Sequence, residues 1–166
     1  APGYDVSLAA SGNISTKTID THYASSDSST IRILANTSDS GSTPFVIGAG
    51  GSNGINGSVN ATRGSGKTIF AVQNGGTGGI DVDGDVIQIQ SSSGPSGSLI
   101  FKAETGEVKI KGHLSVDGAS GQRAGQIVVT ANTVKTTGGA QITANDTFET
   151  DHNHYVTIAA TSLTYT

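Results

Sequence analysis

The 166-residue sequence contains no cysteine, methionine or tryptophan, and it has only four phenylalanines and four tyrosines. Without cysteine no disulfide can stabilise a thin core, and association with further copies is the expected remedy. No apolar run approaches the roughly 20 residues that a membrane-spanning helix needs. The sequence therefore predicts an oligomer and no membrane partner.

Charge is also scarce, because charged residues make up 13% of the chain and the formal net charge is −4. This charge balance gives no positively charged surface that would attract a phosphate backbone, so we expect no nucleic-acid partner. The four histidines lie in no recognisable hydrolase signature, and few aromatics are present to line a glycan-cleaving groove. We therefore expect no enzymatic activity and no cofactor.

Glycine, isoleucine and valine are the residues that define the local structure. The chain has 24 glycines, and its hydrophobic fraction is only 34%. Windows such as 31–35 and 81–89 alternate apolar and polar residues with a period of two, which is the pattern of strands. Clusters of Gly and Ser separate these windows at short intervals and indicate turns. The sequence predicts an all-β protein, with disorder of the Gly/Ser stretches as the alternative.

A pattern recurs around Gly57, Gly84 and Gly112, which lie 27 and 28 residues apart. Each is followed by alternating apolar residues and is preceded by a phenylalanine. These phenylalanines are Phe45, Phe70 and Phe101. A period of this length is typical of stacked supersecondary units. We therefore expect short strand-turn repeats in an elongated structure.

The third copy has one apolar face and one polar face. Its apolar face consists of Val108, Ile110, Leu114 and Val116. These side chains need a cover, and three identical chains around one axis would supply it. The four residues are then expected at the interface of a homotrimer. A sandwich closed within one chain is the alternative.

The chain divides into three segments by composition. We expect an N-terminal arm or attachment segment at 1–40, a Gly-rich β-repeat region at 41–120, and a small sandwich-like or barrel-like β-module at 121–166. Within the terminal module, strands are predicted near 127–130, 141–143, 155–159 and 162–165.

The segment from Phe101 to Val116, and more loosely that from Phe70 to Val86, resembles segments of bacteriophage tail fibres, spikes and head-surface proteins. The residues from Ala124 to Tyr165 resemble small β-modules of capsid exteriors and fibres. The repeat resemblance covers about a third of the chain. It implies a trimeric, β-rich virion protein without enzymatic chemistry.

Three motifs could carry chemistry. The sequence from Ala61 to Thr68 satisfies a permissive nucleotide-binding pattern, but a strand rather than a helix is expected after it, so no phosphate cradle should form. Asp81, Asp83 and Asp85 could chelate calcium, although the spacing departs from an EF-hand and an exposed strand face explains them as well.

His152 and His154 form the third motif, because a His-x-His pair on a strand places both imidazoles on one face. A threefold axis would bring six such nitrogens together, which suits an octahedral transition metal. Two exposed histidines beside a turn are the alternative.

The sequence thus predicts a non-enzymatic virion structural protein, located on the particle surface as a capsid decoration or head-fibre protein. Its partners would be its own copies and the major capsid or other virion proteins. One alternative is a tail-fibre or spike segment that binds host polysaccharide. Another is the subunit of an extracellular filament assembled by strand addition.

Overall fold

The computed structural model describes residues 5–22, 28–38, 41–48, 51–61, 67–83, 87–88, 93–144 and 156–165. These residues form strands, turns and irregular segments, and none of the strands is interrupted by a helix. The all-β prediction is confirmed. No helix long and apolar enough to cross a membrane occurs within the described ranges.

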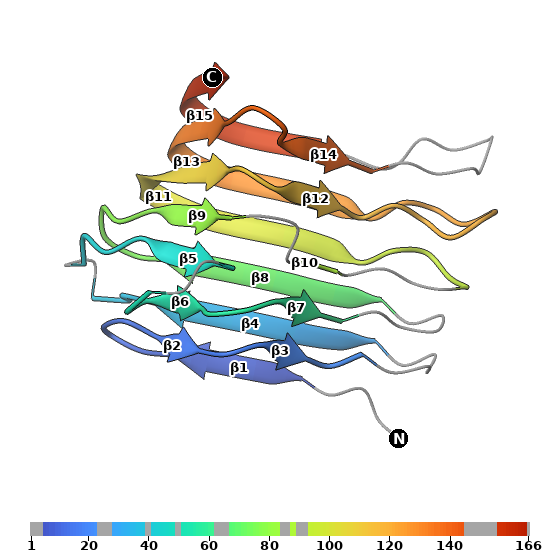
Figure 1. Ribbon diagram of the computed structural model, residues 1–166, viewed down its shortest axis with the longest axis horizontal. Coiled ribbons are helices and arrows are strands. Elements are labelled where there is room, and N and C mark those ends of the chain that lie inside the picture. The colour runs from blue at the N-terminus through green and yellow to red at the C-terminus, as the bar shows by residue number, and fades with distance from the viewer. Residues whose placement is uncertain are drawn as a thin grey trace.

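The main element of the fold is a column of parallel strands, which we call the first column. In spatial order it contains β1 (Val6–Ala9), β4 (Ser29–Ala35), β8 (Thr68–Asn74), β11 (Ser98–Ile110), β13 (Gln126–Thr136) and β15 (Val156–Tyr165). Parallel neighbours require a long connection between them. Here each connection runs across the opposite layer before the next long strand begins (Figure 1).

Short strands form two further columns in that opposite layer (Figure 1). The second column contains β2 (Ser15–Thr16), β6 (Gly54–Ile55), β5 (Phe45–Ile47) and β9 (Ile80–Val82), and it continues through the C-terminal parts of β11, β13 and β15. The third column contains β3 (Ile19–Asp20), β7 (Val59–Asn60), β10 (Ile87–Gln88), β12 (His113–Ser115) and β14 (Gln141–Thr143).

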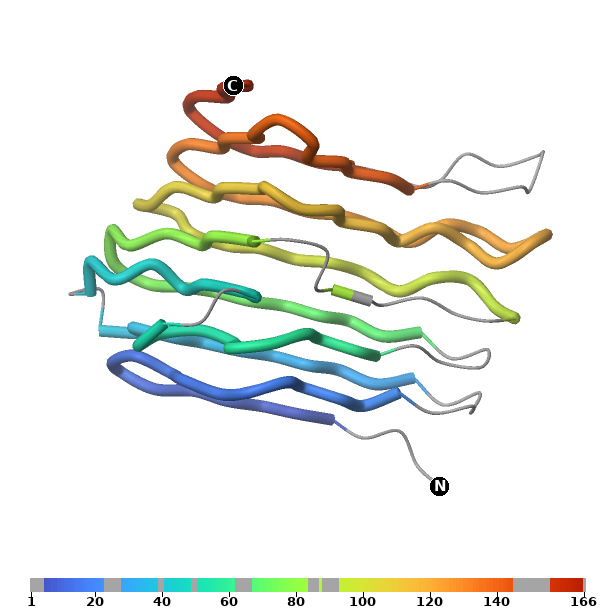
Figure 2. Tube along the Cα trace, in the orientation of Figure 1, coloured from blue at the N-terminus to red at the C-terminus, as the bar shows by residue number. Residues whose placement is uncertain are grey.

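The long strands β11 and β13 belong to both layers because they curl around one edge. In β11 the register shifts between Ala103 and Glu107, and the residues after this irregularity pair with β9 instead of β8. Bulges of this kind bend a strand. The result is one curled parallel sheet, and Figure 2 shows the chain winding from the N-terminus at one end to the C-terminus at the other.

The strand register places similar side chains in rows that run along the stack. One inward row of the first column contains Ile31, Phe70, Leu99, Ile127 and Val156. The neighbouring row includes Phe101, whose ring lies edge-on to that of Phe70 at a centroid distance of 6.3 Å. This geometry is favourable for aromatic rings. Stacked apolar rows between the two layers thus form the core.

The structure corrects the expected role of the third apolar stripe. The side chains of Val108, Ile110, Leu114 and Val116 are each 0% exposed within a single chain. Their cover comes from the opposite layer of the same chain, which the sequence pattern did not reveal because those residues are distant along the chain. A trimer is therefore not required to bury this stripe.

The three expected segments are joined by one sheet. Strand β4 pairs with β8 across the boundary at 40–41, and β11 pairs with β13 across the boundary at 120–121. The strands predicted near 127–130 and 141–143 are confirmed as parts of β13 and β14. The two predicted near 155–159 and 162–165 form the single strand β15.

The 27–28-residue period remains a prediction, and of its three glycines Gly84 lies outside the described residues. Gly57 and Gly112 each lie between the second and third columns, directly after β6 and β11. Phe45 differs from the other two phenylalanines, because it lies in β5 of the second column and pairs with Ile80. Phe70 and Phe101 lie in the first column.

Candidate functional site

The acidic turn that could bind calcium is occupied by a lysine. The Lys111 ammonium nitrogen lies 3.3 Å from a carboxylate oxygen of Asp81 and 3.6 Å from one of Asp83. Burial lowers the pKa of Lys111, but the charges of Asp81 and Asp83 outweigh this and raise the pKa above 10.5. A cation is therefore already present between these carboxylates. Asp85 lies outside the described residues.

The predicted histidine site, His152 and His154, also lies outside the described residues. No group of three or more His, Cys, Asp or Glu side chains that could hold a metal occurs within the described ranges.

A second ion-pair group lies on the outer face of the neighbouring strands. The Glu107 carboxylate is 2.9 Å from the Lys135 ammonium of β13 and 3.4 Å from that of Lys109. Burial raises the pKa of Glu107, but hydrogen bonds from Lys135 and Lys109 and their charges lower it below 4.5. The pair with Lys135 connects β11 to β13, whereas the pair with Lys109 lies within β11.

The nucleotide-binding pattern ends in a strand, as the sequence predicts. Thr68 is the first residue of β8, and Lys67 before it is exposed. The Thr68 hydroxyl donates to the carbonyl of Ala61 at 3.0 Å and lies 3.0 Å from the Ser29 hydroxyl of β4. Thr68 thus stabilises the corner of the stack, and a strand follows it where a phosphate cradle would need a helix.

Buried asparagines perform a similar task at the opposite corner. Asn36 has a φ of 52°, a left-handed conformation that asparagine tolerates better than most residues. Its side chain donates to the Asn74 side chain at 2.8 Å, and Asn74 donates to the carbonyls of Gly79 at 2.6 Å and Thr43 at 3.2 Å. This network satisfies buried polar groups where the chain turns.

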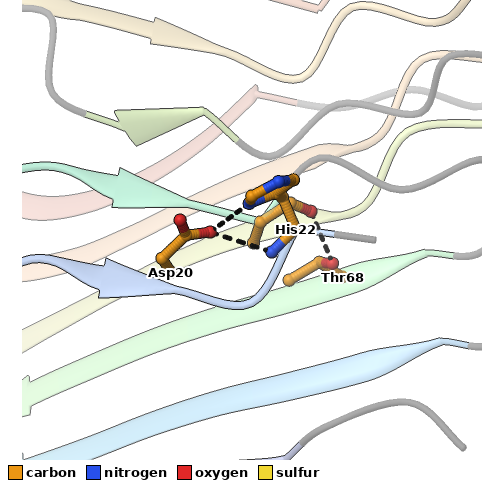
Figure 3. A network of polar contacts seen from close by, with 4 residues as sticks. Asp20, His22 and Thr68 are labelled. Atoms are coloured by element: carbon orange, nitrogen blue, oxygen red, sulfur yellow. Dashed lines mark hydrogen bonds and ion pairs between the residues drawn. The ribbon is translucent and has the colours of Figure 1, made fainter. Parts of the chain in front are cut away.

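The closest approach to acid–base chemistry is the pair of Asp20 and His22, which Figure 3 shows with Thr68 nearby. The Asp20 carboxylate is bonded to the His22 ring nitrogen and to its backbone N–H. The hydrogen bond from the His22 side chain lowers the pKa of Asp20. Both side chains are exposed, and the Thr68 hydroxyl is bonded to Ser29 and Ala61 instead. The described residues place no aligned nucleophile beside the pair.

A further polar cluster that the sequence did not indicate links β12 to β14. Asp117 accepts hydrogen bonds from the hydroxyls of Ser115 at 2.8 Å and Thr143 at 3.1 Å. His113 lies 3.4 Å from the Thr143 hydroxyl through its Nε2 atom. In a hydrolytic triad the serine bonds to the histidine, whereas Ser115 bonds directly to the carboxylate. We therefore interpret this cluster as a connection between neighbouring strands.

The outer face of the first column carries a depression of about 410 Å³. Leu34, Ile69 and Ile100 contribute apolar surface, and Arg32 and Lys102 contribute charge. No aromatic side chain is among its lining residues in the described part of the chain. It therefore lacks the stacking platform that a glycan site usually offers.

The strongest candidate site is the end of the stack formed by β15. Val156 is 44% exposed, Leu163 is 64% exposed and Tyr165 is 75% exposed. Their partners in the preceding strand are Ile127, Val134 and Thr136, and the first two are 0% exposed. The exposed side chains therefore continue buried rows, and no described strand covers them on the side away from β13.

Comparison with known protein families, with curated proteins and with solved structures finds no match to this chain.

Proposed function

We propose that this chain is a non-enzymatic structural protein of a virion surface, and that it acts as a rigid stacked element in a capsid decoration or a fibre. A protein with this task needs a stiff body and an end that joins the next component. The continuous parallel sheet supports the first requirement and the uncovered strand β15 supports the second.

The single observation that carries this proposal is the exposure of Leu163 and Tyr165 in rows that are otherwise part of the core. Large apolar side chains in one contiguous strip usually mark a contact surface. A sheet edge also presents unpaired N–H and C=O groups that favour the addition of another strand. The function supported by this end is assembly.

Two kinds of assembly would cover β15. In a closed trimer, the β15 strands of three copies would meet one another around an axis. In an open stack, β15 would meet the opposite end of the next copy. The open stack corresponds to the alternative of an extracellular filament.

Labelling of native particles tests the proposed function. Antibodies raised against the recombinant chain should label the surface of intact virus particles from the source, and peptide mass spectrometry should find the chain in those particles. Labelling of filaments on cells would favour the filament alternative. Recovery of the chain only from the cell interior would contradict both.

Glycan binding remains the alternative for a fibre or spike. The outer depression with Arg32 and Lys102 offers charge and apolar surface for such a ligand. A glycan array probed with the purified protein distinguishes this role, and substitution of Arg32 by Ala should remove any signal that arises at the depression.

A further inference from the structure

The two ends of the stack present strands of the same direction. Strand β1 pairs only with β4, and β15 pairs only with β13, within the described residues. Every neighbouring pair between them is parallel. The N-terminal end of one copy can therefore follow the C-terminal end of another without any reversal of direction.

The side-chain rows also match between the ends. Following the register back from Val156 through each strand of the first column leads to Val6 of β1, and following it from Ile158 leads to Leu8. Val6 and Leu8 are only partly buried and pack against the core from the N-terminal end. The first column thus begins and ends with apolar residues in the same two rows.

The second column gives the same result. The row of Tyr165 leads back through β13, β11, β9, β5 and β6 to Thr16 of β2. The row of Leu163 leads back to Phe45 of β5. Val46, Gly54 and Ser15 are paired in register, and extending this register by one residue toward the N-terminus continues the row of Phe45 to Ile14. Ile14 is also a partly buried residue that packs against the core.

We infer that β15 of one copy pairs with β1 and β2 of the next copy, so that copies stack head to tail in one continuous parallel sheet. This contact covers Val156 with Val6, Ile158 with Leu8, and Leu163 with Ile14. The inference rests on the assembly end of the proposed function, and it names a second copy of this chain as the partner.

The chemistry of the edges supports this partner. Strands β1, β2 and β15 contain no charged residue and no proline. Edge strands that must stay unpaired usually carry lysine, proline or an inward charge. By contrast, the enclosed strands β11 and β13 carry Lys102, Lys109 and Lys135. The charged residues that would discourage the addition of another strand thus lie in enclosed strands, and the edge strands β1, β2 and β15 have none of them.

The third column limits the junction. Strand β14 is the last described strand of that column, and no third-column strand follows β15 within the described residues. Strand β3 of the next copy would therefore lie two strand spacings from β14, which is too far for direct pairing. The contact between copies is made by the first and second columns.

Cysteine cross-linking tests the register directly, since the natural chain contains no cysteine. Ser7 and Thr157 are exposed, face outward, and occupy the same row at opposite ends. Neighbouring strands lie about 4.8 Å apart, which suits a disulfide between residues in register. Oxidation of the doubly substituted Ser7→Cys, Thr157→Cys protein should produce a ladder of covalent multimers on a non-reducing gel.

The single variants provide the matched controls. A mixture of Ser7→Cys protein and Thr157→Cys protein should give dimers and no longer species, and each alone should stay monomeric. Dimers from Thr157→Cys alone would show that two β15 strands meet, and this would overturn head-to-tail stacking in favour of a closed assembly. The absence of cross-links in every sample at high protein concentration would also overturn the inference.

A second pair of variants separates assembly from folding. Leu163→Asp places a charge in the junction at a side chain that is already 64% exposed in the single chain, so the chain should fold normally but lose the ladder. Ala159→Asp, on the outer face of the same strand, should keep it. A ladder that survives Leu163→Asp would contradict the inference. Because surface labelling of particles does not depend on the register, failure of the cross-link and failure of the proposed function remain distinguishable.

Discussion

At the scale of single residues, close stacking decides where glycine is required. A Cβ atom added to Gly97 would lie 1.8 Å from the Thr68 carbonyl oxygen, and one added to Gly125 would lie 1.7 Å from that of Gly97. Neither distance is compatible with a side chain. These glycines continue the corner row that begins with Ser29 and Thr68, so the later positions of this row have no room for a side chain.

We predict that Gly97→Ala lowers the free energy of unfolding by about 3 kcal/mol or more, because two backbone segments must separate. Gly138→Ala is the matched control, since nothing lies within 4 Å of its added Cβ. Its effect should stay within about 1 kcal/mol of zero. Urea denaturation followed by circular dichroism measures both. Equal stability of the two variants would show that the corner is less tightly packed than the structure indicates.

The buried amide of Asn74 gives a second prediction at this scale. Asn74→Ala removes the acceptor of Asn36 and the donor to Gly79 and Thr43. We expect a loss of about 2–3 kcal/mol in unfolding free energy, because buried polar groups lose their partners. The exposed Asn132 is the control, and Asn132→Ala should change stability by less than about 0.5 kcal/mol. A similar small effect at Asn74 would contradict the proposed network.

At the scale of elements, ion pairs connect neighbouring strands on the outer face. The lowered pKa of Glu107 means that its contribution to stability is present above the unfolded-state value near 4.5. This contribution is lost as the pH falls through the lower folded-state pKa. Glu107→Gln should therefore lower the unfolding free energy at neutral pH by up to about 1 kcal/mol, and the difference should disappear in acid.

Denaturation of both proteins across this pH range measures the effect. Glu104→Gln serves as the control, because the side chain of Glu104 is 64% exposed and its pair with Lys102 lies within one strand. A stability difference for Glu107→Gln that persists unchanged at low pH would exclude the ion pairs as its cause.

The apolar stripe of β11 is enclosed within a single chain, and this enclosure gives a further prediction. Ile110→Asp would bury an unpaired charge in a core that one chain completes by itself, so the chain should fail to fold even when dilute. Ile69→Asp is the matched substitution on the outer face, where the natural side chain is 43% exposed. It should retain the strand spectrum in circular dichroism. A folded Ile110→Asp monomer would show that the enclosure of this stripe is wrong.

At the scale of the whole molecule, stability should follow position in the stack. The central strand β8 pairs with two strands and β11 pairs with three, whereas β1 and β15 each pair with one. Amide hydrogen exchange should therefore be slowest in β8 and β11 and fastest in β1 and β15. If copies stack head to tail, the protection of β15 should rise with protein concentration. Uniform protection at every concentration would contradict this gradient.

Local features such as strands could be predicted from the sequence, whereas contacts between distant residues could not. Period-two alternation indicated the strands around Ile110 and Ile127 correctly, because strand geometry places alternate residues on opposite faces. The same pattern could not identify what covers those faces. The pattern also does not indicate the networks of Asp117 and Asn74, because each includes a side chain far away in the sequence, Thr143 for Asp117 and Asn36 for Asn74.

The all-β class, the turns rich in glycine, and the apolar and polar faces of the strands could all be predicted from the amino-acid sequence. These properties depend on side chains within a few residues of one another. The enclosure of Val108 and Ile110 by their own chain, and the exposure of Leu163 and Tyr165 at the ends of their rows, became evident from the fold alone. Those properties depend on which strands become neighbours, and the parallel register places residues about 25–40 positions apart side by side.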